Sequence, residues 1–224
     1  MRQQEVRAFS EAIQCEASQL TVCDLINDPP SPARCARYDM VLIGGSGDFS
    51  VVTGGQWLPP ALDCMAELVE RGQPTFASCW GFQAMSRALG GEVVTDLERA
   101  ELGTPELTLT DAGIDDPVFG ILPRTFRAPM GHQDIVERLP QGATLLVSSD
   151  RVQHEAFKFP NKPIYGTQFH PELTREGLME RLRTYPEYIE KIAGMPETEF
   201  EQTCQETPDS HRLMGRMIDV VFGV

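Results

Sequence analysis

The sequence lacks any uninterrupted apolar run of about 18 residues, so it predicts no transmembrane helix. Its N-terminus, MRQQEVRAFSEA, also lacks the apolar stretch of a signal peptide. Positive charge is scarce, because 19 Lys and Arg residues stand against 33 Asp and Glu, giving a formal net charge of −14. An acidic surface repels phosphate backbones and anionic membranes, so we expect neither nucleic acid nor a membrane as a partner. Together these absences favour a cytoplasmic location.

Paired cysteines are also missing. None of the six cysteines forms a CxxC pair, and their spacing is scattered. This pattern favours neither a disulfide framework nor a cysteine-based zinc site, and it suits a reducing compartment. The 224 residues, 41% of them hydrophobic, are enough for one full-sized core but few for two.

Short apolar runs alternate with helical patterns along much of the chain. Residues 38–43 form an apolar run typical of a strand buried on both faces, and residues 75–78 and 164–169 predict two further core strands. Residues 57–71 place their apolar side chains at helical spacing, and a second helix follows residue 79. This alternation predicts an α/β fold with an open, mostly parallel, flavodoxin-like sheet and helices on both faces.

The remaining segments predict additions to this core. Residues 92–149 alternate short strands with turns, which predicts a small antiparallel excursion. Other predicted elements are a strand at 20–26 and helices at 3–17, 174–193 and 208–221. We expect one domain over residues 1–194, with a helical extension over 195–224 packed on it.

One cysteine has an unusual local setting. The strand at 75–78 runs directly into Cys79-Trp80-Gly81 and then a helix, which is the layout of a nucleophile elbow. The helix N-terminus should favour the thiolate of Cys79, and the Trp80 backbone N–H would face a developing oxyanion. A free cysteine is more often a buried structural residue, and that is our expectation for Cys15, Cys23, Cys35, Cys64 and Cys204.

A histidine and a glutamate stand at the end of another predicted strand. The run at 164–169 leads into His170-Pro171-Glu172, so the imidazole should lie at the carboxyl edge of the sheet, as Cys79 does. A base near a thiol accepts its proton, and a carboxylate near the base fixes its tautomer. His154 and His211 lack such neighbours, and we expect them to be ordinary hydrogen-bonded residues.

Three motifs in this order resemble the class I, triad-type glutamine amidotransferases. They are GGSGD at 44–48, SCWGFQ at 78–83 and QFHPE at 168–172, supported by ELG at 101–103 and MGH at 130–132. The resemblance covers roughly residues 38–173 and is strongest to stand-alone relatives of the amidotransferase domain of GMP synthase.

The resemblance implies an enzyme that hydrolyses the side-chain amide of glutamine and releases ammonia for an acceptor. Cys79 would form a γ-glutamyl thioester, His170 would act as general base and then acid, and Glu172 would orient His170. The backbone amides of Gly45 and Trp80 would form the oxyanion hole.

The resemblance further implies that Gln83 and the backbone near Gly131 and His132 hold the glutamine. It implies no metal and no organic cofactor, and it suggests a synthase subunit that uses ammonia as a partner. The chain departs from the family pattern at Ala77, where glycine is usual, and in its GGSGD loop, where Gly-Gly-Pro is frequent.

Two alternatives stay open at this point. A γ-glutamyl hydrolase acting on another γ-glutamyl amide or peptide would use the same thioester chemistry. A non-catalytic binding module on this fold is less favoured, because Cys79, His170 and Glu172 are all present at working spacing.

The N-terminal segment conflicts with the resemblance. Related amidotransferases begin with a short apolar strand, whereas residues 3–17 look helical. In flavodoxin-like order that first strand lies between the next two, here 20–26 and 38–43. We expect this slot to be open or poorly paired and the natural protein to begin further upstream. The chain as given should then aggregate readily, and an upstream extension should raise its unfolding midpoint.

Overall fold

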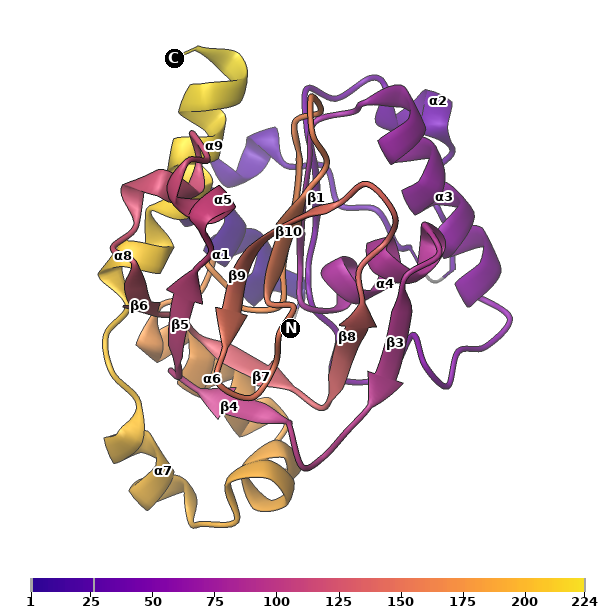
Figure 1. Ribbon diagram of the computed structural model, residues 1–224. Helices are drawn as coiled ribbons and strands as arrows, with labels where there is room; N and C mark the ends of the chain where they lie inside the picture. Colours follow the sequence, from indigo (N-terminus) through magenta and orange to yellow (C-terminus); the bar gives the residue numbers. More distant parts are fainter. Residues whose placement is uncertain (1, 26, 224) are drawn as a thin grey trace.

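The computed structural model describes residues 2–25 and 27–223 (Figure 1). Within these residues the main sheet has seven strands. Their spatial order is β1 (Val41–Ile43), β2 (Thr75–Ser78), β11 (Ile164–Thr167), β10 (Ala156–Lys158), β9 (Thr144–Ser149), β5 (Glu106–Leu109) and β6 (Thr125–Arg127).

The strands nearest the predicted site are parallel. β2 lies between β1 and β11, with Thr75 opposite both Val41 and Ile164. The strands from β10 to β6 continue the sheet in antiparallel pairs. The predicted α/β, flavodoxin-like class is therefore confirmed, but the antiparallel part is larger than expected. It is larger because β5, β6 and β9, predicted as a separate excursion, join the main sheet together with β10.

Two small antiparallel sheets lie beside the main one: β3 (Glu92–Thr95) with β8 (Asp134–Arg138), and β4 (Glu101–Gly103) with β7 (Met130–His132). The α-helices are α1 (Arg2–Ala12), α2 (Pro32–Cys35), α3 (Leu58–Arg71), α4 (Trp80–Ala88), α5 (Asp111–Ile114), α6 (Arg175–Thr184), α7 (Glu197–Thr203), α8 (Pro208–His211) and α9 (Leu213–Phe222). Tighter turns span Ala17–Gln19 and Phe119–Ile121, and a π-helical turn spans Ile189–Ala193.

Helices cover both faces of the sheet, as Figure 1 shows. On one face, Phe9 of α1 and Leu213 of α9 join a buried cluster that includes Phe76 of β2. On the other face, α3 and α4 pack against the sheet in a second cluster that includes Ala77 and Ile164. These two cores hold β2 and β11 rigidly, and both strands lead directly into the predicted site.

No helix among the described residues is both long and apolar enough to cross a membrane.

Three predicted helices are shorter or broken. The helix predicted over 174–193 ends at Thr184, because Tyr185 precedes Pro186 and a residue before proline disfavours the α conformation. The C-terminal helix is divided at Arg212 into α8 and α9. The first helix ends at Ala12, and Gln14 adopts a positive φ of 56° that cannot continue it.

The strand predicted at 20–26 is wrong for the residues that the structure describes, 20–25, while Ile26 lies outside them. Residues 2–12 form a helix, so the helix predicted from residue 3 is confirmed in its first part and no strand occupies this segment. Among described strands, β1 therefore pairs only with β2. A cavity of about 1060 Å³ is lined by both Leu20–Leu25 and Val41–Ile43, so the expected slot is open. A strand needs a ladder partner, and branched residues alone do not supply one.

Candidate active site

The site is built on a strained turn between β2 and α4. β2 ends at Ser78, α4 begins at Trp80, and Cys79 between them has φ 51° and ψ −103°. A non-glycine residue in this region is strained and persists only where its surroundings hold it. The backbone N–H of Cys79 donates to the carbonyl oxygen of Thr167 at 2.7 Å. The predicted nucleophile elbow is therefore present and is tied to the end of β11.

Gly81 lets the elbow approach β1 closely. A Cβ atom at this position would lie 2.7 Å from Ile43 Cγ2 and 2.9 Å from the Ile43 carbonyl oxygen. The Gly81 N–H also donates to the carbonyl of Gly44 at 3.2 Å. The absence of a side chain here joins the start of α4 to the glycine loop that follows β1.

His170 and Glu172 form a close buried pair beyond the end of β11. His170 Nδ1 lies 2.7 Å from Glu172 Oε1, and both residues are buried. Arg181 Nη1 lies 3.2 Å from the same imidazole nitrogen and 3.8 Å from Glu172 Oε1. An arginine can only donate, so Nδ1 cannot both accept from Arg181 and donate to Glu172. The shorter contact to the carboxylate favours Nδ1–H, which leaves the lone pair on Nε2.

Cys79 and the imidazole of His170 border the same space beside Gly45. A Cβ atom on Gly45 would lie 3.5 Å from Cys79 Cβ, 3.5 Å from His170 Nε2 and 2.8 Å from His170 Cε1. Cys79, His170 and Gly45 also line the same cavity. The structure thus brings the predicted nucleophile, base and glycine loop to one edge of the sheet.

Opposing effects act on the ionisation of Cys79. Burial raises the pKa of its thiol to about 12, although the charge of Arg181 and the N–H of Trp80 act in the opposite direction. The Trp80 N–H at the helix N-terminus does favour the thiolate, as expected, but burial outweighs it and the pKa of the thiol is raised. A neutral thiol must transfer its proton to a base when it attacks. Burial raises the pKa of Glu172, but the contact with His170 and the charge of Arg181 outweigh burial, so the pKa is lowered and Glu172 is ionised.

The predicted glutamine-binding residues occupy different positions around this edge. The Gly131 carbonyl lies 3.9 Å from Cys79 Sγ, and Gly131 lines the cavity. The Gln83 side chain is buried and donates to the Asp134 carbonyl at 2.8 Å and to Gln168 Oε1 at 3.1 Å. The imidazole of His132 faces Glu101, with Nε2 3.6 Å from Oε2.

The other cysteines and histidines largely behave as ordinary residues. Cys35, Cys64 and Cys204 are buried in hydrophobic clusters, whereas Cys15 and Cys23 are half-buried. His154 and His211 each place Nδ1 within hydrogen-bond distance of a backbone carbonyl.

Two charged residues near the site were not predicted. Arg181 lies on α6, eleven positions after His170, and its side chain is only 12% exposed. Glu5 of α1 reaches the glycine loop, and its pKa is raised, mainly by burial, against the opposing charge of Arg181 and the N–H of Gly45. Neither residue belongs to a local motif, so only the packing of α1 and α6 against the site reveals them.

A comparison with protein families identifies the family of the chain. The family model for "Glutamine amidotransferase class-I" matches residues 8–181, well over half of the chain. The chain belongs to this family. The match includes the glycine loop, the elbow and the His170–Glu172 pair.

Relatives of this class I amidotransferase are GMP synthases and their subunits. It is 37% identical over 123 residues to a glutamine-hydrolysing GMP synthase subunit of Methanocaldococcus jannaschii, covering 55% of this chain and 63% of the relative. It is 32% identical over 163 residues to a glutamine-hydrolysing GMP synthase of Corynebacterium ammoniagenes, covering 73% of this chain and 29% of that protein. The match thus spans under two thirds of the first relative and under a third of the second.

Solved structures show the same fold. A glutamine amidotransferase from Thermotoga maritima superposes with a TM-score of 0.69 at 21% identity, covering 84% of this chain and 80% of that one. A glutamine amidotransferase from Methylobacillus flagellatus gives a TM-score of 0.65 at 18% identity, covering 85% and 80%. At these identities the likeness establishes the fold of this amidotransferase.

Proposed function

We propose that the chain hydrolyses the side-chain amide of glutamine through a γ-glutamyl thioester on Cys79 and releases ammonia. One observation carries this proposal: Cys79 and His170 border the same space beside Gly45. A Cβ atom on Gly45 would lie 3.5 Å from both Cys79 Cβ and His170 Nε2. A nucleophile, a base and an orienting carboxylate in this order are what acyl transfer from an amide requires.

The reaction begins with the neutral thiol. As Cys79 Sγ attacks the amide carbon of glutamine, His170 Nε2 accepts the thiol proton and a carbon–sulfur bond forms. The ionised Glu172, 2.7 Å from His170 Nδ1, stabilises the resulting imidazolium. Collapse of the tetrahedral intermediate breaks the carbon–nitrogen bond, and His170 returns the proton to the leaving ammonia. Water, activated by His170, then hydrolyses the thioester to glutamate and the free thiol.

Backbone groups of the site stabilise the developing negative charge and bind the substrate in this proposal. The N–H groups of Gly45 and Trp80 act as the oxyanion hole in this proposal, because both residues line the cavity beside Cys79. Gly131 contributes its backbone to the glutamine site. Gln83 and His132 support the glutamine site indirectly in this proposal. Their side chains contact other protein groups behind the residues that line the cavity.

We expect a diazo-ketone analogue of glutamine to alkylate Cys79 alone, because binding places its electrophilic carbon at Sγ. Peptide mass spectrometry after proteolysis would locate the label, and excess glutamine should slow labelling. Cys64 provides an internal comparison, since burial also raises its thiol pKa to about 12 and it lines the same cavity, but it lies within α3 rather than at the elbow. Labelling of Cys64 or Cys204 with Cys79 unmodified would overturn the assignment.

We also expect the isolated chain to release ammonia from glutamine only slowly, because one of its relatives is a subunit of a larger synthase. The ammonia acceptor in this proposal is a synthase partner, whose addition should accelerate turnover. A coupled ammonia assay with free glutamine and with γ-glutamyl peptides measures this. Rapid turnover of glutamine by the chain alone would contradict the dependence on a partner. Faster turnover of a γ-glutamyl peptide would instead establish a γ-glutamyl hydrolase.

A further inference from the structure

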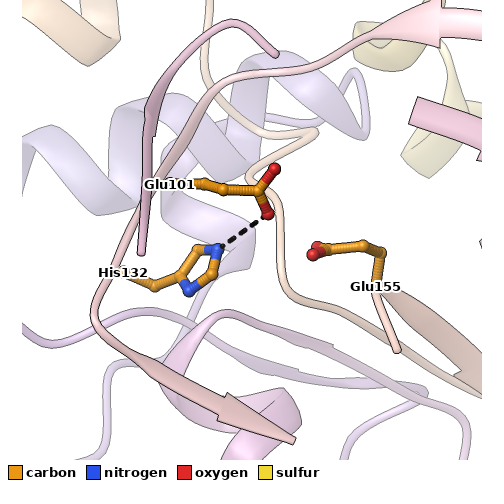
Figure 2. A group of neighbouring side chains, drawn as sticks. All are labelled: Glu101, His132 and Glu155. Carbon is orange, nitrogen blue, oxygen red and sulfur yellow. Dashed lines mark ion pairs between the residues drawn. The ribbon is translucent and has the colours of Figure 1, made fainter. Parts of the chain in front are cut away.

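Three buried side chains gather behind the active-site cavity and take no part in the proposed thioester chemistry. Glu101 and His132 face each other across the β4–β7 pair, and Glu155 immediately precedes β10. Their residues are 6%, 2% and 0% exposed, respectively. Figure 2 shows the two carboxylates and the imidazole directed toward one another. Each residue offers one possible ligand atom, and these three atoms lie within 4.8 Å of one another.

The hydrogen bonding of His132 selects one tautomer. Nδ1 lies 3.2 Å from the Asp134 carbonyl oxygen, which can only accept a hydrogen bond. Nδ1 therefore carries the proton, and the lone pair is on Nε2. This assignment holds for the neutral imidazole, the form that can bind a metal, and its Nε2 atom is buried with no hydrogen-bond partner among the described residues. A histidine that donates through one nitrogen to a carbonyl and offers the other is the usual arrangement of a metal ligand.

Glu155 supplies a second, independent indication. Both of its carboxylate oxygens are buried and have no hydrogen-bond partner within the described parts of the chain. Its backbone is fixed, because its N–H donates to the Val147 carbonyl at 3.0 Å and its carbonyl accepts from the Gln168 N–H at 2.7 Å. A buried carboxylate without partners is costly unless a proton or a cation compensates it.

The spacing of the donor atoms fits a small divalent ion. Bonds of about 2.0–2.1 Å in a tetrahedral zinc site place neighbouring ligand atoms roughly 3.3 Å apart. His132 Nε2 and Glu101 Oε2 are already 3.6 Å apart. Ser149 Oγ donates to Glu101 Oε2 at 3.1 Å and would orient that carboxylate as an outer partner.

We propose that Glu101, His132 and Glu155 bind a zinc ion, at a site separate from Cys79 and independent of the proposed glutaminase chemistry. One imidazole and two carboxylates make a mixed nitrogen–oxygen set, which suits zinc better than calcium or magnesium, whose sites are built of oxygen ligands. Two ionised carboxylates also balance the double positive charge. Water would complete the coordination.

A zinc ion at this site would stabilise the wall of the neighbouring active-site cavity. His132 directly follows Gly131, whose carbonyl lies 3.9 Å from Cys79 Sγ. A metal held by β4, β7 and the start of β10 would fix these segments against the main sheet. Without a metal, a proton is the alternative: burial and the charge of Glu101 raise the pKa of Glu155 well above its usual range.

Zinc alone is the probe for the test. The full chain, stripped with a chelator and desalted, would be titrated with zinc in competition with a chromophoric chelator. We expect one zinc ion per chain at this site and an upward shift of the unfolding midpoint, because an ion that binds only the folded state stabilises it. X-ray absorption should show nitrogen and oxygen ligands at about 2.0–2.1 Å and no sulfur at about 2.3 Å.

Two matched variants separate this site from the active-site thiol, which could itself bind zinc. Glu155→Gln keeps the shape but removes a ligand, so we expect zinc affinity to fall by more than the roughly 10–100-fold typical of outer partners. Its metal-free unfolding midpoint should be no lower than that of the unmodified chain, because glutamine is neutral like a protonated Glu155. Such a midpoint would exclude misfolding as the cause of weaker zinc binding. Cys79→Ala should retain zinc.

Zinc binding that is equal in the Glu155→Gln variant and the unmodified chain would overturn the proposal. A sulfur ligand, or loss of zinc in Cys79→Ala alone, would overturn it too and place the ion at the active site. Failure of the unmodified chain to bind zinc would also overturn it, and the three side chains would then be a proton-sharing cluster.

Discussion

Cys79→Ala and His170→Ala should each lower the turnover of glutamine by at least roughly 10⁴-fold, because triad members act as a unit. Removing the sulfur eliminates the atom that forms the thioester. Removing the imidazole leaves a buried thiol whose pKa of about 12 prevents spontaneous ionisation near neutral pH. The measurement is steady-state ammonia release in the presence of whichever partner supports full activity.

Glu172→Gln should lower turnover less. We expect the loss to be smaller by roughly one to two orders of magnitude than the loss caused by removing the nucleophile or the base, because an orienting residue of a triad takes no direct part in bond making. Circular dichroism would establish that each variant is folded. Cys204→Ala is the matched control, since Cys204 is a buried thiol in the cluster around α6 and α7. The mechanism is refuted if His170→Ala retains substantial activity, or if Cys204→Ala loses as much as Cys79→Ala.

Methyl groups added at Gly45 and at Gly81 should have different effects. At Gly45 the new Cβ would lie 2.8 Å from His170 Cε1, so the imidazole must move. We expect turnover to fall at least about 100-fold, as misplacement of a catalytic group by an ångström does. The unfolding midpoint should change little, because this contact involves a side chain at the cavity rather than the packed core.

At Gly81 the new Cβ would lie 2.9 Å from the Ile43 carbonyl oxygen, and backbone cannot move aside cheaply. Gly81→Ala should therefore lower both turnover and stability, the latter by about 1–3 kcal/mol, as overpacking of cores does. Thermal unfolding and ammonia release, measured together, distinguish the two variants. Gly215→Ala is the control, because its nearest contact, 3.6 Å from the Ala12 carbonyl oxygen, is an ordinary one. A fully active, fully stable Gly81→Ala protein would show that the elbow tolerates a side chain.

The part of the site that the sequence predicts is the part encoded in short motifs. The strand over 75–78 is found to the residue, because the short run TFAS followed by Cys79-Trp80-Gly81 specifies both its end and the turn. His170 and Glu172 lie together because they follow one strand directly.

The remainder depends on packing between distant segments. Residues 20–25 have strand-like composition but no ladder partner, so composition alone was misleading. Arg181 reaches His170 only because α6 turns back over the site. Glu101, His132 and Glu155 come from three separate segments, and no spacing rule in the sequence would have brought them together.

The one-sided pairing of β1 has a consequence for local unfolding. Within the described chain, Val41–Ile43 are held by β2 alone, and the open cavity lies along their other side. Backbone groups at an unpaired sheet edge are more accessible to solvent, and such regions open at a smaller free energy than the global unfolding of a domain. β1 continues into the loop that carries Gly45, and the Gly81 N–H holds this loop at the Gly44 carbonyl, so we expect the loop to open more readily than β2, β11 and the Cys79 elbow. Amide hydrogen exchange should therefore be faster in β1 than in β2, making the glycine loop the least stable wall of the active site.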